Sequence, residues 1–274
     1  MTSVLRYAAF TLDPAGGNPA GVVLDARGLD DDTMQAIAAD VGYSETAFLT
    51  EEATDVQPVR YFSPKAEVPF CGHATVATAV AIAERNGPGE IVFSTAAGLV
   101  PVMVDDDLRA TLTSVEPHVE EAGDIQDVLK LLGWSAEELN PELPPRIAYA
   151  GARHLVLSTA TRQRLADLEY DFDGLTAYML ERDLTTLQLV WRESPTVFHV
   201  RDPFPVGGVV EDPATGAAAA AFGAYLRELG LAQPAITLHQ GDDLGRPSLI
   251  TVELRPDDSR VRVSGNAVPI TAPA

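Results

Sequence analysis

Two runs of this sequence place titratable side chains at the start of helices that are otherwise almost free of charge. His73 follows Gly72 in the first run, and Asp212 precedes Gly216 and Ala217 in the second. The N-terminus of a helix presents unpaired N–H groups and the positive end of a dipole, which suit a carboxylate or an enolate-like anion. Glycine at such an end lets a ligand approach the backbone. The two runs therefore predict contacts to a small anionic substrate.

Simpler explanations exist for both titratable residues. Asp212 lies directly before Pro213, and an Asp-Pro pair commonly begins a helix with the aspartate as an ordinary N-cap. His73 equally fits a structural histidine whose ring is hydrogen-bonded at the helix start. The residue types alone leave both interpretations open.

Two further candidates lie outside these helices. Asn18 lies in a tight Gly-Gly-Asn-Pro turn before a predicted strand, where turn chemistry alone explains an asparagine. Ser44 and Glu45 lie between a predicted helix and the predicted strand 46–49. A glutamate at such a junction is usually a solvated surface acid, and composition alone favours that interpretation of Glu45.

The helices behind the two runs differ from ordinary surface helices. Residues 72–86 (GHATVATAVAIAERN) and 215–229 (TGAAAAAFGAYLREL) are Ala-rich and carry almost no charge before their last turns. A helix that is apolar on all faces is normally buried on all faces. Each of the two ends at a glycine, Gly87 or Gly230, as expected of a C-cap. We therefore expect two central helices, each enclosed by strands.

Short segments rich in β-branched residues dominate the rest of the chain and are typical of strands. Amphipathic segments at 33–41, 125–132 and 173–184 predict surface helices. The expected strands are 4–10, 20–24, 46–49, 59–62, 91–94, 99–104, 108–113, 147–150, 154–158, 186–191, 196–201, 235–239, 248–254 and 260–264.

The surroundings of the two Ala-rich helices repeat. Each helix follows a strand with an arginine near its end and a Pro-containing loop, and each precedes two strands joined by a Gly-containing turn. We interpret this as a divergent internal duplication, with chance similarity as the alternative. The predicted fold class is α+β, with two pseudo-repeated lobes, each a mostly antiparallel β-barrel or roll around a central Ala-rich helix. A linker over residues 115–124 would separate lobes 1–116 and 117–274, and the last strand can return to the N-terminal lobe.

Composition and charge argue against several classes of partner. The chain has 274 residues and a formal net charge of −21, whereas nucleic acids and anionic membranes are bound through Lys and Arg. The one cysteine, Cys71, allows no intrachain disulfide. No apolar run reaches the length of about 18 residues expected of a membrane span, and no signal-peptide pattern is present, so we expect a cytoplasmic protein. The histidines show no metal-ligand spacing, and no metal is predicted.

A set of motifs in this chain resembles the PhzF-like phenazine-biosynthesis family. The motifs are GGNPAGVVLDA (16–26), YSETAFL (43–49), RYFSPKAEVPFCGHATVATA (60–79), EDPATGAAAAAFGAYL (211–226), QGDDLGRPSLI (240–250) and VSGNAV (263–268). They follow the family's order and cover nearly the whole chain. The resemblance implies a fold like that of diaminopimelate epimerase, with two related lobes and an active site between them. It also implies an isomerase that needs no cofactor and forms a homodimer.

The resemblance also implies roles for single residues. Glu45 matches the family's acid–base glutamate, and His73 and Asp212 match its histidine and aspartate near the two central helices. Asn18 and Ser44 match other positions that line the site.

One position departs from the family pattern. Many relatives have a serine after the DPATG run, where this chain has Ala217. The departure predicts a different substrate and leaves weakened activity open, while the backbone amides of Gly216 and Ala217 still offer an anion site. Arg153 and His154, next to a glycine turn, are weaker candidates for substrate contact.

The cysteine count bears on the type of reaction. Epimerases of this fold use two cysteines, one on each face of the substrate carbon, but the run 212–217 contains none. We therefore predict a cofactor-independent isomerase that catalyses a 1,3- or 1,5-proton shift on a small cyclic carboxylate, with Glu45 as general acid/base. The alternatives are an amino-acid epimerase or racemase, and a non-catalytic homologue that binds a small molecule.

Overall fold

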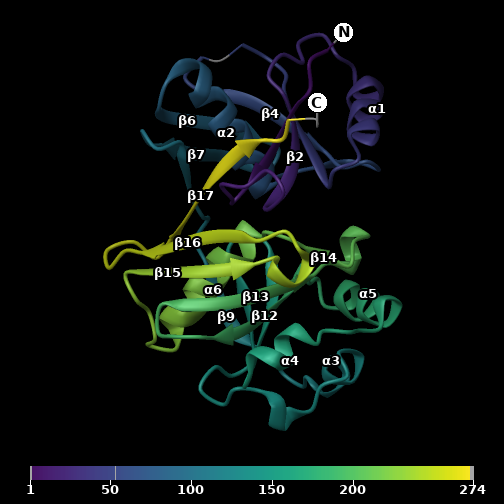
Figure 1. Cartoon of the computed structure of the whole chain (residues 1–274), viewed down its shortest axis with the longest axis vertical. Coiled ribbons are helices and arrows are strands. Elements are labelled where there is room, and N and C mark those ends of the chain that lie inside the picture. The colour runs from purple at the N-terminus through teal and green to yellow at the C-terminus, as the bar shows by residue number, and fades with distance from the viewer. Residues whose placement is uncertain (1, 53, 272–274) are drawn as a thin grey trace. The chain divides into compact units, whose positions relative to one another are not determined.

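A computed structural model describes residues 2–52 and 54–271 of the chain. The chain divides into two compact units: unit 1 contains Met1–Thr113 and Ser264–Ala274, and unit 2 contains Ser114–Val263. Each unit is described by itself. Unit 1 takes in the end of the chain as well as its beginning, so the yellow end of the ribbon joins the purple strands in Figure 1.

Unit 1 is a closed β-barrel. Its strands follow one another in the order β1, β2, β3, β4, β6, β7, β8 and β17, and β17 pairs with β1 to close the circuit. The pairs β2–β3 and β4–β6 are parallel, whereas β1–β2, β3–β4, β6–β7 and β7–β8 are antiparallel. The strands are β1 (Leu5–Ala9), β2 (Asn18–Val23), β3 (Glu45–Leu49), β4 (Gln57–Phe62), β5 (Glu67–Val68), β6 (Gly89–Thr95), β7 (Gly98–Val104), β8 (Arg109–Thr113) and β17 (Val261–Pro269).

The helix α2 (Gly72–Asn86) is the central helix of this barrel and packs against β1, β2, β3, β7 and β8. Its residues from His73 to Ala81 are all buried, because small side chains let strands approach the helix from every direction. The hydroxyls of Thr75 and Thr78 donate to the carbonyls of Cys71 and Ala74 one turn earlier. These two polar side chains are therefore satisfied within the barrel.

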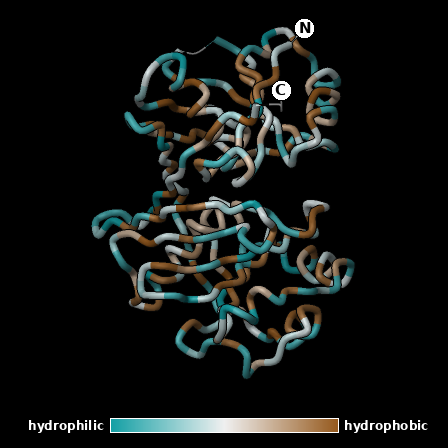
Figure 2. Tube along the Cα trace, in the orientation of Figure 1, coloured by the Kyte–Doolittle hydropathy of each residue, from teal (hydrophilic) through white to brown (hydrophobic). Residues whose placement is uncertain are grey.

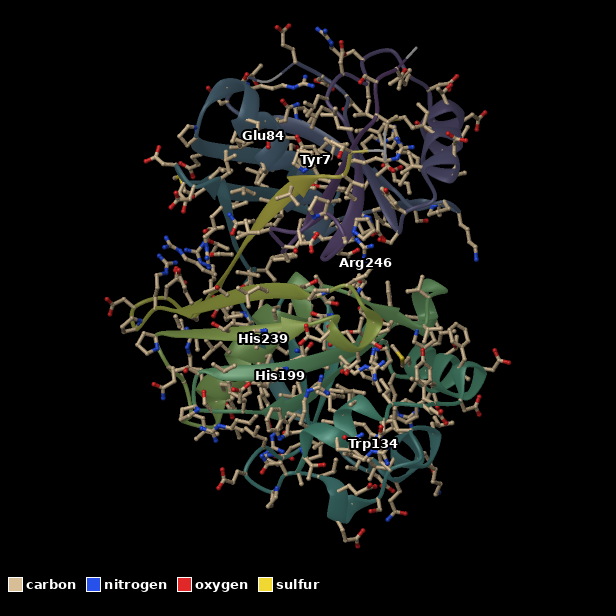
Figure 3. All side chains as sticks on the ribbon, viewed as in Figure 1. Tyr7, Glu84, Trp134, His199, His239 and Arg246 are labelled. Carbon is tan, nitrogen blue, oxygen red and sulfur yellow. The ribbon has the colours of Figure 1, made fainter. Side chains whose placement is uncertain are left out.

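A side-chain contact fixes the far end of α2 to the wall of the barrel. Tyr7 of β1 lies next to Glu84 in the last turns of α2, and both are labelled in Figure 3. The phenol of Tyr7 donates to Oε2 of Glu84 at 2.5 Å. The central helix is thus held at both its buried beginning and its more exposed end.

The helix α1 (Asp31–Val41) covers the outside of the barrel. Asp30 caps it by accepting from the backbone N–H of Thr33. Its apolar side, with Met34 and Ala38, packs on Phe48 and Phe62 of the strands below, and Figure 2 shows brown and teal alternating along its turns. This amphipathic helix ends three residues before Ser44 and so sets where β3 begins.

Unit 2 is a mixed sheet that packs on a second central helix, α6 (Gly216–Glu228). The strand order is β9, β10, β11, β12, β13, β15 and β16, and the pairs β11–β12 and β13–β15 are parallel. Gly223 of α6 lies so close to β16 that an added Cβ would meet Cγ1 of Val252 at 2.8 Å. The strands are β9 (His118–Glu121), β10 (Arg146–Tyr149), β11 (Arg153–Thr159), β12 (Thr186–Arg192), β13 (Val197–Pro203), β14 (Glu211–Asp212), β15 (Ala235–Gln240) and β16 (Ser248–Leu254).

A layer of short helices packs on this sheet and encloses a separate apolar core. Leu155 and Leu157 of β11 and Leu187 and Leu189 of β12 face this core. Alternate residues share a face of a strand, so each of these strands contributes two leucines. The helices are α3 (Gln126–Leu131), α4 (Arg162–Ala166) and α5 (Phe172–Glu181), with 3₁₀ turns η1 (Ala136–Glu138), η2 (Pro205–Gly207) and η3 (Asp242–Leu244).

The prediction of a linker over residues 115–124 is wrong at β9. Two acidic residues suggested a solvated connection, but Glu120 and Glu121 form ion pairs with Arg153 and Arg146 of unit 2, at 2.7 and 3.1 Å. The backbone of β9 pairs antiparallel with β10 and so forms an edge strand of the sheet. Among the described residues, none of the helices has the length and apolarity that crossing a membrane requires.

Candidate active site

Glu45 is the first residue of β3 and lies three residues after Gly42, the C-cap residue of α1. Gly42 ends α1 in the left-handed region with φ of 71°, which glycine adopts without strain. Glu45 then pairs with Ala20 at the first register position of the parallel pair β2–β3. Its side chain is only 15% exposed, so the interpretation of Glu45 as a solvated surface acid is wrong.

Cys71 and His73 come from the beginning of α2. Cys71 is the N-cap residue, and His73 is the second residue of the helix. Both are buried, at 8% and 6% exposed. Between them, Gly72 has no atom within 4 Å of the position that a Cβ would take. The backbone at this end of the helix is therefore open to close approach.

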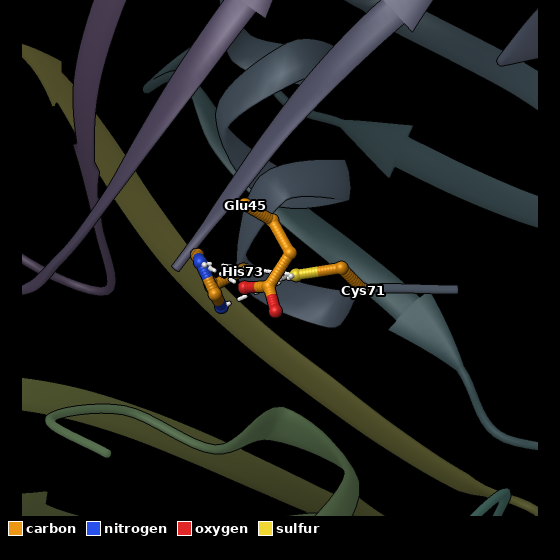
Figure 4. A group of neighbouring side chains, drawn as sticks. All are labelled: Glu45, Cys71 and His73. Carbon is orange, nitrogen blue, oxygen red and sulfur yellow. Dashed lines mark hydrogen bonds and ion pairs between the residues drawn. The ribbon is translucent and has the colours of Figure 1, made fainter. Parts of the chain in front are cut away.

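The side chains of Glu45, Cys71 and His73 converge from β3 and α2, as Figure 4 shows. Nε2 of His73 lies 3.4 Å from Oε2 of Glu45. The thiol of Cys71 donates to the same Oε2 at 3.4 Å, and its sulfur lies 3.4 Å from Nδ1 of His73. Three groups that can each carry a proton thus meet at one point.

Asn18 and Ser44 hold the ring of His73 from two sides. The amide nitrogen of Asn18 lies 3.1 Å from Nδ1, and the hydroxyl of Ser44 lies 3.3 Å from Nε2. An amide nitrogen only donates, so Nδ1 accepts and the neutral ring carries its proton on Nε2. That proton faces Ser44 and Glu45.

Burial raises the pKa of Glu45 above its usual value. Hydrogen bonds from Ser44 and Cys71 favour the charged carboxylate and act in the opposite direction, but they are the smaller effects. A carboxyl group with a raised pKa keeps part of its neutral form closer to neutral pH. Such a group can both remove and return a proton, which is the requirement for general acid–base catalysis.

In unit 2 the polar groups at the start of α6 are connected to one another. Thr215, the N-cap residue, donates its hydroxyl to Oδ2 of Asp212 at 2.6 Å. Gln240 accepts from the backbone N–H of Thr215 at 3.0 Å and donates to the backbone carbonyl of Asp212 at 2.8 Å. Gly216 and Ala217 then begin the helix. Asp212 is thus held by its neighbours in a fixed orientation.

A second aspartate lies behind this group. Asp202 has no exposed surface and pairs with Asp212 in the register of β13 and β14. Gln188, with its amide nitrogen turned toward Asp202, donates to both carboxyl oxygens at 2.8 and 3.0 Å. Burial raises the pKa of Asp202 well above its usual value, and the nearby Asp212 and Glu211 add to the rise.

The structure brings together the predicted residues Glu45, His73, Asn18 and Ser44 within unit 1. Asp212, Gly216 and Ala217 belong to unit 2, and their meeting with the first group stays a prediction. Sequence analysis considered Cys71 only through the cysteine count and missed its contact with Glu45. It also missed the groups around Asp212, whose members Asp202, Thr215 and Gln240 come from separate strands and the start of α6.

The weaker candidate His154 lies in the core of unit 2. It has no exposed surface, and its Nδ1 lies 2.8 Å from the hydroxyl of Thr186. Burial lowers the pKa of His154 to about 3, so the ring is neutral. A side chain without exposed surface cannot touch a substrate, and this candidate is wrong.

A cavity of about 460 Å³ in unit 1 does not coincide with this site. It is lined by residues at the far end of α2, among them Ile82, Arg85 and Gly87. A helix rises about 1.5 Å per residue, so this cavity is on the order of 20 Å from Gly72. The buried titratable groups therefore identify the candidate site better than the volume of the cavity does.

Comparisons with known proteins identify the family and the fold of this chain. The family model described as phenazine biosynthesis-like protein, PhzC-PhzF, matches residues 7–272. The uncharacterized isomerase YfhB of Bacillus subtilis is 30% identical, over 97% of this chain and 95% of that protein. The crystal structure of a phenazine biosynthesis protein of the PhzF family from Bacillus anthracis has a TM-score of 0.88 at 26% identity, covering 98% of this chain and 97% of that one.

A more distant comparison concerns the fold alone. The crystal structure of a probable proline racemase from Agrobacterium radiobacter has a TM-score of 0.68 at 12% identity, covering 98% of this chain and 91% of that one. The fold is thus of the mixed α/β, epimerase-like type that the sequence predicted in outline. The full-length match to the family model and the close structural relative lead to one conclusion: the chain belongs to the PhzC-PhzF family of phenazine biosynthesis-like proteins and is an isomerase.

Proposed function

We propose that this isomerase moves a proton between two carbon atoms of a small cyclic carboxylate, with Glu45 as its general acid/base and without a cofactor. The observation that carries the proposal is the position of Glu45. Its carboxyl group is buried, has a raised pKa and lies 3.4 Å from both Cys71 and Nε2 of His73. The family's isomerase assignment supplies the type of reaction.

The proposed reaction needs a single carboxyl group. The carboxylate of Glu45 takes a proton from one carbon of the substrate, and the electron pair of the broken C–H bond is delocalised toward the substrate carboxylate. The protonated Glu45 then returns the proton to a second carbon on the same face. Acid–base help of this kind accelerates a reaction by about 10²- to 10⁴-fold.

His73 would steady Glu45 between the two half-reactions. Its Nε2–H faces Oε2 of Glu45, and Asn18 on the other nitrogen keeps the ring in that tautomer. The backbone amides at the start of α2, next to the open position at Gly72, would bind the anionic substrate.

We further propose that Asp212, Gly216 and Ala217, at the start of α6, take part in substrate binding. The fixed orientation of Asp212 by Thr215 and Gln240 supports a positioning role. The two enclosed helices, one in each unit, also support the proposed internal duplication. Ala217 has no hydroxyl group to offer, which favours a substrate that differs from those of relatives with serine at this position.

The test is proton exchange in deuterated water. A panel of cyclic and amino-acid carboxylates is incubated with the enzyme, and NMR follows the entry of deuterium and the movement of the double bond. Glu45→Gln is expected to lose exchange while keeping its fold and ligand binding. The matched control, Glu90→Gln, changes an exposed glutamate of β6. Near-normal exchange in Glu45→Gln would remove Glu45 from the reaction.

Epimerisation is the second candidate, and one observation favours it. Cys71 contacts Glu45, so the site holds a second group that can carry a proton. Deuterium entering a stereogenic α-carbon with loss of configuration, and failing to do so in Cys71→Ala, would support the epimerase over the proton shift.

A further inference from the structure

We propose that Glu45, Cys71 and His73 form a zinc-binding site, and that Zn²⁺ bound there inhibits the enzyme. The inhibition rests on the proposed function of Glu45, whereas the binding does not. Within the residues that the structure describes, this trio offers three ligand atoms that all lie within 4.8 Å of one another.

The separations of the three ligand atoms fit a tetrahedral zinc site. Bonds of about 2.3 Å to sulfur and about 2.0–2.1 Å to nitrogen and oxygen place two ligand atoms of such a site about 3.3–3.6 Å apart. Oε2 of Glu45 lies 3.4 Å from the sulfur of Cys71 and 3.4 Å from Nε2 of His73. The sulfur and Nε2 are 3.8 Å apart. A small movement of one side chain brings all three separations between ligand atoms into the range of a tetrahedral zinc site.

The chemistry of the donors selects Zn²⁺ over other common ions. A thiolate, an imidazole and a carboxylate are the ligands of zinc sites, whereas Mg²⁺ and Ca²⁺ prefer oxygen atoms alone. One thiolate and one carboxylate together carry two negative charges. They balance the charge of a divalent ion at a place where the three side chains are mostly buried.

Asn18 is placed to support the imidazole ligand. When Nε2 binds the metal, the ring proton moves to Nδ1, 3.1 Å from the amide of Asn18. Half a turn of that amide presents its oxygen as the acceptor. Partners of this kind fix the orientation of histidine ligands in known metal sites.

The three protein ligands leave one coordination position for water, as in open zinc sites. Binding would also occupy the oxygen of Glu45 that faces His73 and Cys71. A carboxylate oxygen that is bonded to Zn²⁺ is a much weaker base, so it cannot take a proton from the substrate. The expected consequence is inhibition that a chelator reverses.

A competing cluster in unit 2 provides the control. His199 lies 2.7 Å from Glu193 and 3.6 Å from Asp242, and its ring stacks on His239 (Figure 3). This cluster also contains imidazole and carboxylate groups but has no sulfur. His199→Asn therefore tests whether zinc binds there instead.

The binding experiment uses the full-length protein after EDTA treatment and gel filtration. Titration with Zn²⁺ against a coloured chelator should show one tight site, and Cys71→Ser and His73→Asn should weaken it by at least about 100-fold, since loss of a mere supporting residue already costs 10- to 100-fold. His199→Asn should bind like the wild type. Co²⁺ in the wild-type protein should give a sulfur-to-cobalt charge-transfer band, which does not depend on any variant folding.

The outcomes separate the two proposals. Undiminished zinc binding in Cys71→Ser, loss of binding in His199→Asn, or a cobalt complex without the sulfur band would overturn the zinc site. Zinc binding by a protein that exchanges no proton on any carboxylate would leave the site standing and refute the proposed function. Proton exchange that is unaffected by saturating Zn²⁺ would refute the inhibition.

Discussion

The phenol of Tyr7 donates a hydrogen bond of 2.5 Å to Oε2 of Glu84, joining the first strand of the barrel to the last turns of its central helix. A hydrogen bond to a charged group contributes roughly 1.5–3 kcal/mol when buried. Glu84 is partly open to solvent, so we expect Tyr7→Phe to lower the free energy of unfolding by about 1 kcal/mol. Chemical denaturation of the wild type and the variant measures this change in the free energy of unfolding. Glu84→Gln, which keeps a neutral acceptor, should lose less, and an equal loss in both variants would assign the contribution to the charge.

Arg201 and Glu211 form a buried ion pair that stabilises unit 2. Nη2 of Arg201 donates to Oε2 of Glu211 at 2.6 Å, and the two side chains are 10% and 1% exposed. Burial raises the pKa of Glu211, and Arg201 opposes that rise. Arg201→Met leaves a buried charge without its partner and should cost about 3–5 kcal/mol of unfolding free energy.

The double variant Arg201→Met/Glu211→Leu should recover most of that loss, because no charge is then left buried. Lys130→Ala is the control, since Lys130 and Asp127 are 74% and 71% exposed. Exposed pairs contribute about 0–1 kcal/mol. A double variant as unstable as Arg201→Met would show that packing, and not charge, holds this region.

The buried carboxyl group of Asp202 should make the free energy of unfolding fall as the pH rises. The pKa of Asp202 is raised in the folded protein. The contribution of this carboxyl group to the free energy of unfolding is therefore fully present below the pKa that Asp202 has in the unfolded chain, and it is lost as the pH rises through the pKa that Asp202 has in the folded protein. Asp202→Asn removes that loss of stability, because an asparagine side chain does not ionise. We expect the variant to gain thermal stability relative to the wild type as the pH rises above the ordinary carboxyl range, and calorimetry over a pH series checks this. A difference independent of pH would mean that Asp202 is not buried as an acid.

Gly72 and Gly223 allow a matched comparison of two helical glycines. A Cβ at Gly223 would meet Val252 at 2.8 Å, whereas one at Gly72 would meet no atom within 4 Å. Gly223→Ala should therefore destabilise the protein by about 1–3 kcal/mol, and Gly72→Ala should leave stability within about 0.5 kcal/mol.

The expected effect of Gly72→Ala is on the ligand instead. An added methyl group at the open start of α2 should weaken carboxylate binding and raise KM. Unchanged KM in Gly72→Ala would argue that the substrate does not approach this backbone.

The fold was predictable where local patterns and packing agree. The predicted helix 72–86 has the same bounds as α2. Its apolar residues and the glycine that follows it are signals within the segment itself, so no distant contact was needed to predict it. β9 was missed because Glu120 and Glu121 read as solvated charges. Their partners Arg153 and Arg146 lie on other strands, and only the register of unit 2 brings them together.

The candidate site was predictable only in part. The residues next to Glu45 in the sequence indicated a surface acid, and only the resemblance to a family identified Glu45 as a site residue. Its burial depends on the parallel pairing of β2 and β3, and its contact with Cys71 depends on where α2 enters the barrel. Neither relationship can be inferred from a short run of neighbouring residues, so sequence analysis identified Glu45 and His73 but not the trio that they form with Cys71.

The strand β17 begins in unit 2 and completes the barrel of unit 1 against β1. During synthesis on the ribosome, β1 and β8 therefore keep one unpaired edge each until β17 has been made. Unpaired strand edges are templates for aggregation. A nascent chain stalled before residue 264 should depend on chaperones, and the N-terminal unit should acquire resistance to protease only after β17 has emerged.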